Sequence, residues 1–482
     1  MEQSVDFSWS ELGSLALGKL PGRAPITIPL QATVQDALQA MDRHRVGSII
    51  IVDPQDGRPT GILTLQDVLR RIALPQLDLS QPVALAMTPQ LETIDETASV
   101  HEGLLFMSHR RIRHLPVVNG VGQLVRVISM NQVRDPFIGE VDLLMAQIDE
   151  AEDIERLEQL SRQAKALGIS LSTQHGDSGL LTSVLSALND AIARRAIELV
   201  VAHSRLPAVP WCWIVMGSEG RFEQTFHTDQ DNGLIFQAET AQEASELRQM
   251  FLPLAKQVND YLDLCGVPHC SGGIMAGNPE CCLSLDEWQA RFFQWVQTPD
   301  PKALLNATIF FDYRSLYGED SLAKRLRDYL MQITRDQGGF FRLLASNALE
   351  ATPPIGMLRD FVTTMDADKR RTLDLKKFGA RIFVDTARIL ALDSGVSQTN
   401  TVARLRTSGP STGIHPTDID SAVQAFAQLQ RIRMSNQLRA GMIDNKNLLD
   451  PDSLHRLDRK ILRESLVQAQ QLQSILRRRY AL

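Results

Sequence analysis

Several features of membrane, secreted and nucleic-acid-binding proteins are missing from this sequence. No run of about 18 apolar residues occurs, so we predict no membrane-spanning helix. The first residues, MEQSVDFSWSELGS, lack the basic start and apolar stretch of a signal peptide, and cysteines number only five. We therefore expect a cytoplasmic protein. The net charge of −7 argues against nucleic acid as a partner.

Cysteine is scarce, but four of the five cysteines lie close together in the sequence. Their spacing matches no paired CxxC pattern, and two adjacent cysteines suit a tetrahedral metal site poorly. We interpret them as reduced, partly buried thiols. A metal site that includes a nearby histidine is the alternative. The residues concerned are Cys265, His269, Cys270, Cys281 and Cys282.

An internal repeat occupies the first 140 residues. Residues 32–53, ATVQDALQAMDRHRVGSIIIVD, align without a gap with residues 98–119, ASVHEGLLFMSHRRIRHLPVVN. Each copy has a helix-start signal, an apolar pattern of helical period and then a β-branched strand. A second strand that ends in a hydroxyl residue and another helix follow. We expect these three elements at 49–52, 61–64 and 65–72 in the first copy, and at 115–118, 126–129 and 130–135 in the second.

This β-α-β-β-α pattern resembles the CBS domain, which commonly occurs in tandem and holds an adenosine nucleotide between the copies. In that family a Thr/Ser-x-x-Asp sequence after the last strand contacts phosphate and ribose. Residues 64–67, TLQD, match it, whereas residues 129–132, SMNQ, end in glutamine. The resemblance implies AMP or ATP as a ligand of Thr64, Asp67 and Ser129, and a homodimer. A plain helix cap at Thr64 is the alternative.

The stretch GSEGRFEQTFHTDQDNGLIF, residues 217–236, places a glycine turn and two carboxylates between strand-like segments. Residues two apart in a strand point the same way, so we expect Asp229 and Asp231 on one face. Adjacent carboxylates raise each other's pKa, and a divalent cation such as Mg²⁺ relieves this repulsion. The turn at Gly217 and Ser218 allows backbone N–H groups to approach an anion. This combination is typical of nucleoside triphosphate chemistry.

The same stretch resembles the nucleotidyltransferase superfamily of DNA polymerase β. It is most similar to the DUF294 branch, which is related to the N-terminal domain of bacterial PII-protein uridylyltransferases. The resemblance implies a mixed sheet with helices, Mg²⁺ (or Mn²⁺) at Asp229 and Asp231, and ATP or UTP as donor. It also implies phosphate contacts from Gly217, Ser218 and Arg221.

The superfamily requires a third carboxylate on a neighbouring strand. Residues 309–311, IFF, look like a strand, and Asp312 follows them. The resemblance implies that Asp312 is a metal ligand, or the base that deprotonates the attacking hydroxyl, and that Arg314 faces phosphate. A cap at a strand end is the alternative for Asp312.

The last third of the chain is helical by period and resembles the substrate-binding helical domain that follows the nucleotidyltransferase domain in the DUF294 branch. Lys377, Arg381 and Arg388 recur at i, i+4 and i+11 on one predicted helix face. They are available for a triphosphate or an acidic partner. Pairing with Asp374 and Asp385 is the alternative.

We therefore predict an α+β multidomain protein. It has an extension over 1–19, a CBS pair over 20–140 with copies at 20–76 and 82–138, a nucleotidyltransferase-like domain over 141–320 and a helical bundle over 321–482. The predicted activity is transfer of a nucleoside monophosphate to an acceptor hydroxyl, under control of the CBS pair. The resemblance implies that this hydroxyl belongs to a regulatory protein. The alternative is a non-catalytic signal-transduction protein that senses nucleotide and binds a partner through its helices.

Overall fold

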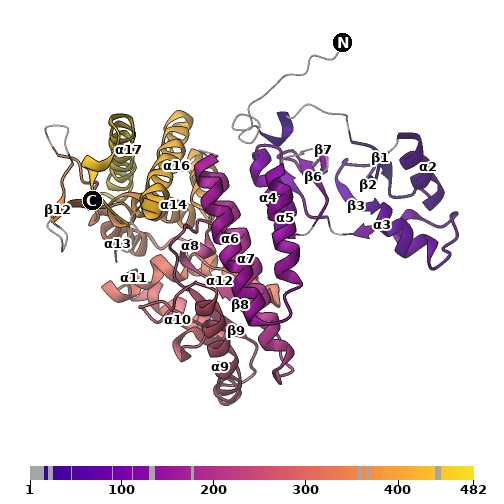
Figure 1. The fold of residues 1–482 in the computed structure, drawn as a ribbon, viewed down its shortest axis with the longest axis horizontal. Helices are drawn as coiled ribbons and strands as arrows, with labels where there is room; N and C mark the ends of the chain where they lie inside the picture. Colours follow the sequence, from indigo (N-terminus) through magenta and orange to yellow (C-terminus); the bar gives the residue numbers. More distant parts are fainter. Residues whose placement is uncertain are drawn as a thin grey trace, which may run out of the picture. The chain divides into compact units, whose positions relative to one another are not determined.

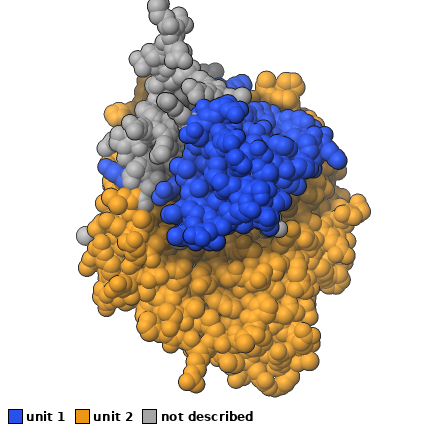
Figure 2. Space-filling view, turned by 90° about the vertical axis from the view of Figure 1, so that its right-hand side faces the viewer, with its two compact units in different colours: residues 1–142 blue, residues 143–482 orange. Residues whose placement is uncertain are grey.

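The computed structural model describes residues 16–19, 25–44, 46–89, 91–110, 112–129, 136–174, 178–356, 361–365, 370–439 and 447–482. The chain divides into two compact units, Met1–Asp142 and Leu143–Leu482, which are shown as a ribbon in Figure 1 and in two colours in Figure 2. Within the described residues no helix has the length and apolarity needed to span a membrane.

The first unit contains two small sheets built on one plan. In each sheet a short strand pairs in parallel with the next strand, which then forms an antiparallel hairpin. A helix connects the two parallel strands. The first sheet, in the order β1-β2-β3-β4, has β1 Thr27–Pro29, α2 Val34–His44, β2 Ser48–Val52, β3 Pro59–Thr64 and β4 Thr88–Pro89; the second has β5 Ile94–Asp95, α4 Val100–Arg110, β6 His114–Val118 and β7 Leu124–Ser129.

The repeat predicted from the sequence is therefore confirmed in its strands and connecting helices. The helix expected at 65–72 is present as α3 Leu65–Asp67 followed by the π-helix η2 Val68–Ala73. The helix expected at 130–135 lies outside the described residues. Each copy buries its own apolar cluster, around Ile49 and Leu63 in the first copy and around Leu115 and Val117 in the second.

The second unit is built around a four-stranded mixed sheet in the order β10-β9-β8-β11. The central strands β8 and β9 are antiparallel, β10 runs parallel to β9, and β11 runs antiparallel to β8. The central strands are almost completely buried, since helices cover the sheet. The strands are β8 Trp211–Val215, β9 Asn232–Phe236, β10 Cys282–Ser284 and β11 Arg314–Gly318.

Long helices precede the sheet and helices also connect its strands. Two of these helices, α6 and α7, run side by side (Figure 1). Trp288 and Trp295 are buried on one face of α10 and belong to the core. These helices are α5 Pro136–Asp149, α6 Ile154–Gln174, α7 Ser178–Ala202, α8 Gly217–Gly220, α9 Ala241–Leu264, α10 Leu285–Gln297 and α11 Pro301–Phe310.

The C-terminal region is mainly helical, as predicted, and adds a small three-stranded sheet in the order β12-β13-β14. Its helices share one apolar core with the four-stranded sheet, from Cys212 to Leu476. The elements are α12 Asp320–Thr334, α13 Gly338–Leu349, β12 Thr364–Met365, β13 Arg371–Asp374, the π-helix η6 Lys376–Ala380, α14 Arg381–Asp393, α15 Thr401–Ser408, α16 Pro416–Arg439, β14 Leu448–Leu449, the short 3₁₀ helix η8 Pro451–Ser453 and α17 Arg456–Tyr480.

Two local predictions in this unit were wrong. Residues 309–311 end the helix α11 and do not form a strand, because Asp300 caps this helix and Ala303, Ala307 and Phe310 are buried at helical spacing. The strand begins later, at Arg314. Gly217 and Ser218 open the short helix α8, where a simple turn was expected.

Candidate functional site

The two predicted metal-binding carboxylates lie at the start of β9. Asp229 and Asp231 precede this strand, which begins at Asn232, so the prediction that they lie within the strand was wrong by a few residues. The carbonyl of Asp231 accepts from the N–H of Met216 at 2.8 Å, and Met216 already lies beyond the end of β8 at Val215.

Buried amides fix the direction of the two carboxylates. Gln230 and Asn232 alternate with Asp229 and Asp231, and both amides are at most 2% exposed. Asn259 of α9 donates to Gln230 Oε1 at 2.8 Å and to Asn232 Oδ1 at 3.0 Å. Because alternate residues of an extended chain point to opposite sides, these inward amides direct the aspartates to the other side.

The expected convergence of the aspartates is present, with an additional group. One carboxylate oxygen from each of Asp229 and Asp231 and the Sγ of Cys270 lie within 4.8 Å of one another. Burial, and then the neighbouring Asp229, raise the pKa of Asp231 to about 6. Two repelling carboxylates fit a divalent cation. The thiol makes the set differ from the all-oxygen site that Mg²⁺ prefers.

Gly217 makes room for this pair. Its φ is +59°, and a Cβ at this position would lie 2.9 Å from Oδ2 of Asp231. Both the backbone conformation and the close approach therefore favour glycine. The start of α8 thus lies directly beside the carboxylate pair, with Ser218 as the next residue.

Asp312 has surroundings that differ from those expected of a metal ligand or base. It is fully buried, and its two oxygens accept four hydrogen bonds of 2.6–3.0 Å from Arg221, Arg388 and Arg404. Burial alone would raise its pKa, but Arg388, Arg404 and Arg221 hold the pKa of Asp312 far below its usual range. It is also not among the described residues that converge on Asp229.

The two arginines predicted to contact phosphate are likewise engaged. Arg221 donates through Nε to Glu223 and through Nη1 to Asp312, each at 2.8 Å. Nη2 of Arg314 donates to Oδ1 of Asp190 on α7 at 2.6 Å. The guanidinium carbon of Arg314 lies 3.7 Å from the centroid of the Phe222 ring. These contacts organise the loop that follows α8.

An acidic group that no sequence motif indicated lies beside Arg314. Glu219 is 7% exposed, and its carbonyl oxygen accepts from Nε of Arg314 at 3.1 Å. Burial, and then the nearby Asp190, raise the pKa of Glu219 to about 8. Its side chain is therefore mainly protonated at neutral pH.

The C-terminal helical region holds the loop after α8 from the other side. Thr399 Oγ1 donates to the carbonyl of Gly220 at 2.7 Å, and the backbone N–H of Thr401 donates to Glu223 at 2.7 Å. Asn400 Nδ2 donates to the carbonyl of Arg221 at 3.1 Å. With Arg388 and Arg404, these contacts join the two predicted domains of the second unit.

The cationic face predicted for residues 377–388 is mostly neutralised. Asp385 accepts from Arg381 at 3.0 Å and from Arg388 at 2.6 Å, so the pairing alternative holds for both arginines. Asp374 accepts instead from the backbone N–H of Lys377. The side chain of Lys377 is exposed and lies near the ring of Phe378.

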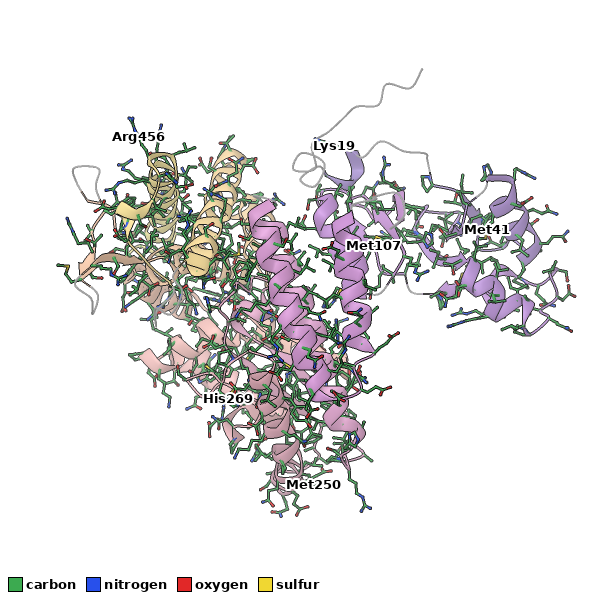
Figure 3. The ribbon with its side chains drawn as sticks, viewed as in Figure 1. Lys19, Met41, Met107, Met250, His269 and Arg456 are labelled. Atoms are coloured by element: carbon green, nitrogen blue, oxygen red, sulfur yellow. The ribbon has the colours of Figure 1, made fainter. Side chains whose placement is uncertain are left out.

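The remaining cysteines do not form the metal cluster considered as an alternative. Cys212, Cys265, Cys281 and Cys282 are buried thiols, and among the described residues only Cys270 belongs to a converging metal-ligand group. The ring of His269 lies near Asp260 and Asp263 of α9. Figure 3 labels His269 between Arg456 and Met250 in this unit.

The predicted nucleotide motif in the first unit forms a helix cap. Thr64 Oγ1 accepts from the N–H of Asp67, and Oδ2 of Asp67 accepts from Thr64 Oγ1 at 2.6 Å. Thr88 donates to the other carboxylate oxygen at 3.2 Å. Thr64 pairs with Ser48 in the first sheet as Ser129 pairs with His114 in the second, so Thr64 and Ser129 occupy equivalent positions.

Sequence reasoning missed the groups that only folding brings to the site. Asp190, Thr399 and Arg404 carry no local motif, and their separation from the loop after α8 exceeds 25 residues in each case. Cys270 stands in a glycine-rich segment, residues 270–277, and glycines allow a close approach of the backbone. The glycines mark this segment, but no local pattern shows that Cys270 lies beside Asp229 and Asp231.

Family models match most of this architecture. The model described as "Putative nucleotidyltransferase DUF294" matches residues 162–302, and that of its substrate-binding domain matches residues 338–480. The CBS domain model matches residues 17–74 and 83–137. The chain is a CBS-pair protein of the DUF294 type. The resemblance and the α+β fold class stated from the sequence are thereby confirmed.

Curated relatives of this DUF294-type protein match shorter segments. An uncharacterized 17.7 kDa protein of Acidianus ambivalens is 30% identical over 101 residues, which are 21% of this chain and 60% of the relative. A mitochondrial CBS domain-containing protein of Arabidopsis thaliana is 32% identical over 105 residues, 21% of this chain and 50% of the relative. The chain thus spans about half to three fifths of these relatives.

Solved structures also match the DUF294-type protein over a limited part. A CBS domain protein of Pyrobaculum aerophilum complexed with AMP is 28% identical, with a TM-score of 0.24, and covers 26% of this chain and 96% of that chain. The cytosolic domain of the Mg²⁺ channel MgtE in complex with ATP is 24% identical, with a TM-score of 0.20. The match covers 22% of this chain and 42% of that chain.

Proposed function

We propose that this protein transfers a nucleoside monophosphate from ATP or UTP to an acceptor hydroxyl and releases pyrophosphate. The hydroxyl oxygen attacks the α-phosphorus, the bond to the bridging oxygen breaks, and the hydroxyl proton passes to a base or to water. The observation that carries the proposal is the convergence of Asp229 and Asp231 beside Gly217 in the segment that matches the DUF294 nucleotidyltransferase model.

Asp229 and Asp231 are the proposed ligands of Mg²⁺ or Mn²⁺. A divalent cation at this place neutralises charge on the triphosphate and on the leaving pyrophosphate. The first N–H groups of a helix have no acceptor within the helix, so those of Gly217 and Ser218 in α8 are the proposed phosphate contacts.

Arg221 and Arg314 are assigned a positioning part in this proposal. Their ion pairs with Glu223, Asp312 and Asp190 support that part better than the direct phosphate contact expected from the resemblance. Asp312 anchors the loop after α8 through its arginines. A role for Asp312 as base or metal ligand requires that these arginines move away.

The CBS pair is the proposed sensor of AMP or ATP. Thr64, Asp67 and, in the second copy, Ser129 are the proposed ligand contacts, and the helix start at Leu65 suits a phosphate. Binding that favours one conformation of the chain would change the transferase activity through linked equilibria. The proposed acceptor is a hydroxyl of a regulatory protein, as in uridylyltransferases.

One observation favours a second candidate function. The third carboxylate, that of Asp312, forms ion pairs with three arginines. This arrangement also fits a non-catalytic protein that binds nucleotide at Asp229 and Asp231 and binds a partner through its helices. This candidate predicts nucleotide binding without release of pyrophosphate.

The transferase proposal is tested with the full chain, labelled ATP or UTP, Mg²⁺ or Mn²⁺, and cell extract. We expect a labelled acceptor and released pyrophosphate, both lost in Asp229→Asn/Asp231→Asn. Asp260→Asn is the matched control, because this aspartate is exposed on α9. Transfer that persists in the double variant contradicts the site, and nucleotide binding without any transfer supports the second candidate.

The sensor proposal is tested by calorimetry of the full chain with AMP and ATP. Asp67→Ala should abolish the heat assigned to the CBS pair. Asp36→Ala is the control, because Asp36 makes the same type of capping contact with Thr33 in the same copy. Equal loss of binding in both variants would show that the effect comes from the fold and not from a ligand contact.

A further inference from the structure

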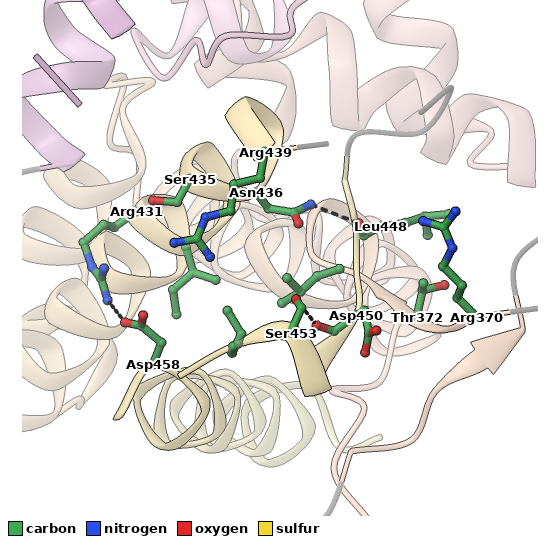
Figure 4. Close-up of a pocket in the computed structure, with 13 residues that line it drawn as sticks. Arg370, Thr372, Arg431, Ser435, Asn436, Arg439, Leu448, Asp450, Ser453 and Asp458 are labelled. Atoms are coloured by element: carbon green, nitrogen blue, oxygen red, sulfur yellow. Dashed lines mark hydrogen bonds and ion pairs between the residues drawn. The ribbon is translucent and has the colours of Figure 1, made fainter. Parts of the chain in front are cut away.

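A cavity of about 330 Å³ lies in the C-terminal helical region. Its walls come from β13, α16, β14, η8 and the start of α17 (Figure 4). None of its lining residues belongs to the segment that carries Asp229 and Asp231. Its volume is in the range of pockets that hold small organic molecules.

The charged groups of the cavity favour an anion. Three arginines and two aspartates line it. Arg431 pairs with Asp458 at 2.6 Å, and Oδ1 of Asp450 accepts from the backbone N–H of Asp452. Within the described part of the chain Arg439 has no ion-pair partner. Among the described lining residues the arginines therefore outnumber the aspartates by one.

Polar groups of the cavity offer further contacts. Ser435 and Asn436 line it one helical turn below Arg439, and Asn436 also donates to the carbonyl of Leu448 at 2.9 Å. Thr372 is 4% exposed, and its hydroxyl oxygen is buried without a hydrogen-bond partner among the described residues. Because this oxygen is not accessible from the cavity, the further polar contacts come from Ser435 and Asn436.

An apolar wall completes the cavity. Ile432, Leu448, Leu449 and Leu454 line it beside the arginines. A purely inorganic anion would leave this wall in contact with water, whereas a molecule with an apolar body would cover it. The cavity therefore combines a cationic group, hydrogen-bonding groups and an apolar surface, as ligand pockets generally do.

We propose that this cavity binds a small organic anion, a carboxylate or phosphate joined to an apolar or ring-shaped body. Arg439 meets the anionic group, and the leucine-rich wall meets the body. The inference does not depend on the proposed transferase activity.

The cavity is separate from the candidate catalytic site, although both use α16. Arg433 and Gln437 are buried on α16, roughly 200° around the helix from Arg431 and Ser435. The pKa of Arg433 is lowered by burial, and its charge interacts with Arg221 and Glu223 in the loop after α8. The two sides of α16 thus belong to different sites.

Calorimetry of the full chain with phenyl phosphate and with benzoate tests the inference. We expect one of these probes to bind at millimolar concentration, and Arg439→Gln to weaken it by about tenfold, because a charge-assisted hydrogen bond is lost. Arg406→Gln, an exposed arginine of α15, is the matched control and should bind normally. Inorganic phosphate and benzyl alcohol should bind more weakly, since each lacks one half of the ligand.

The preferred probe identifies the anionic group, phosphate or carboxylate, and either result supports the site. Absence of heat with both probes would overturn the inference, as would equal affinity of wild type and Arg439→Gln. Thermal unfolding of Arg439→Gln checks that the variant is folded. If it is not, Ser435→Ala replaces it with the same expectation of weaker binding.

Discussion

At the scale of one residue, the fold raises the pKa of the Asp231 carboxyl, and this favours binding of a divalent cation. Burial and the adjacent Asp229 raise its pKa to about 6. A raised carboxyl pKa stabilises the fold at low pH, and this contribution is lost as the pH rises through the folded-state pKa. Above about pH 6 the ionised pair therefore destabilises the loop, and a divalent cation offsets that cost.

We expect the melting temperature to rise more with Mn²⁺ or Mg²⁺ at about pH 7.5 than at about pH 5, because protons compete with the cation below the raised pKa. Differential scanning calorimetry measures this shift. Asp231→Asn should show little shift at either pH. Equal shifts in wild type at both pH values would contradict a site at Asp231.

Asp312 and its arginines give a second prediction at the residue scale. Arg404 is fully buried and donates to Oδ1 of Asp312 at 2.6 Å. Arg404→Met should lower the free energy of unfolding by about 3–5 kcal/mol, because it leaves a buried carboxylate short of a partner. Arg406→Met on the same helix should change it by less than about 0.5 kcal/mol. Urea unfolding measures both; similar losses in the two variants would refute the network.

The helix α8 illustrates what matters at the scale of an element. It has only four residues, and it is held between Asp231 on one side and the segment at Asp312 on the other. A Cβ on Gly220 would lie 1.9 Å from the carbonyl oxygen of Asp312. The position of α8, and with it the proposed phosphate contact, therefore depends on the absence of a side chain.

Gly220→Ala should force α8 away from Asp312, lower the free energy of unfolding by about 1–3 kcal/mol or more and reduce the metal-dependent shift in melting temperature. Gly339→Ala is the matched control, since a Cβ there meets nothing within 4 Å. Chemical unfolding and calorimetry report the two effects. A Gly220→Ala variant as stable as the control would show that α8 can move freely.

At the scale of the whole molecule, exposed leucines of the CBS pair bear on whether two copies of the chain associate. Leu65 and Leu69 lie one helical turn apart in α3 and η2 and are 64% and 56% exposed. Exposed leucines adjacent on one helix face often mark an interaction surface. They support the expectation of a homodimer formed through the CBS helices.

Leu65→Lys/Leu69→Lys should shift the mass measured by light scattering from dimer towards monomer, because two charges would have to be buried at the contact. Leu457→Lys, at an equally exposed leucine of α17, should leave the mass unchanged. A monomeric wild type, or a double variant that stays dimeric, would exclude this surface.

The sequence by itself determined the repeat, the two hairpin strands of each CBS copy, the paired aspartates and the helical C-terminal region. These features follow from local period, turn residues and spacing, which act over a few residues. Folding alone decided what surrounds Asp312, because Arg221, Arg388 and Arg404 come from separate elements and meet only in the shared core. It likewise decided that Cys270 joins Asp229 and Asp231, since burial and charge contacts between distant segments have no local signal.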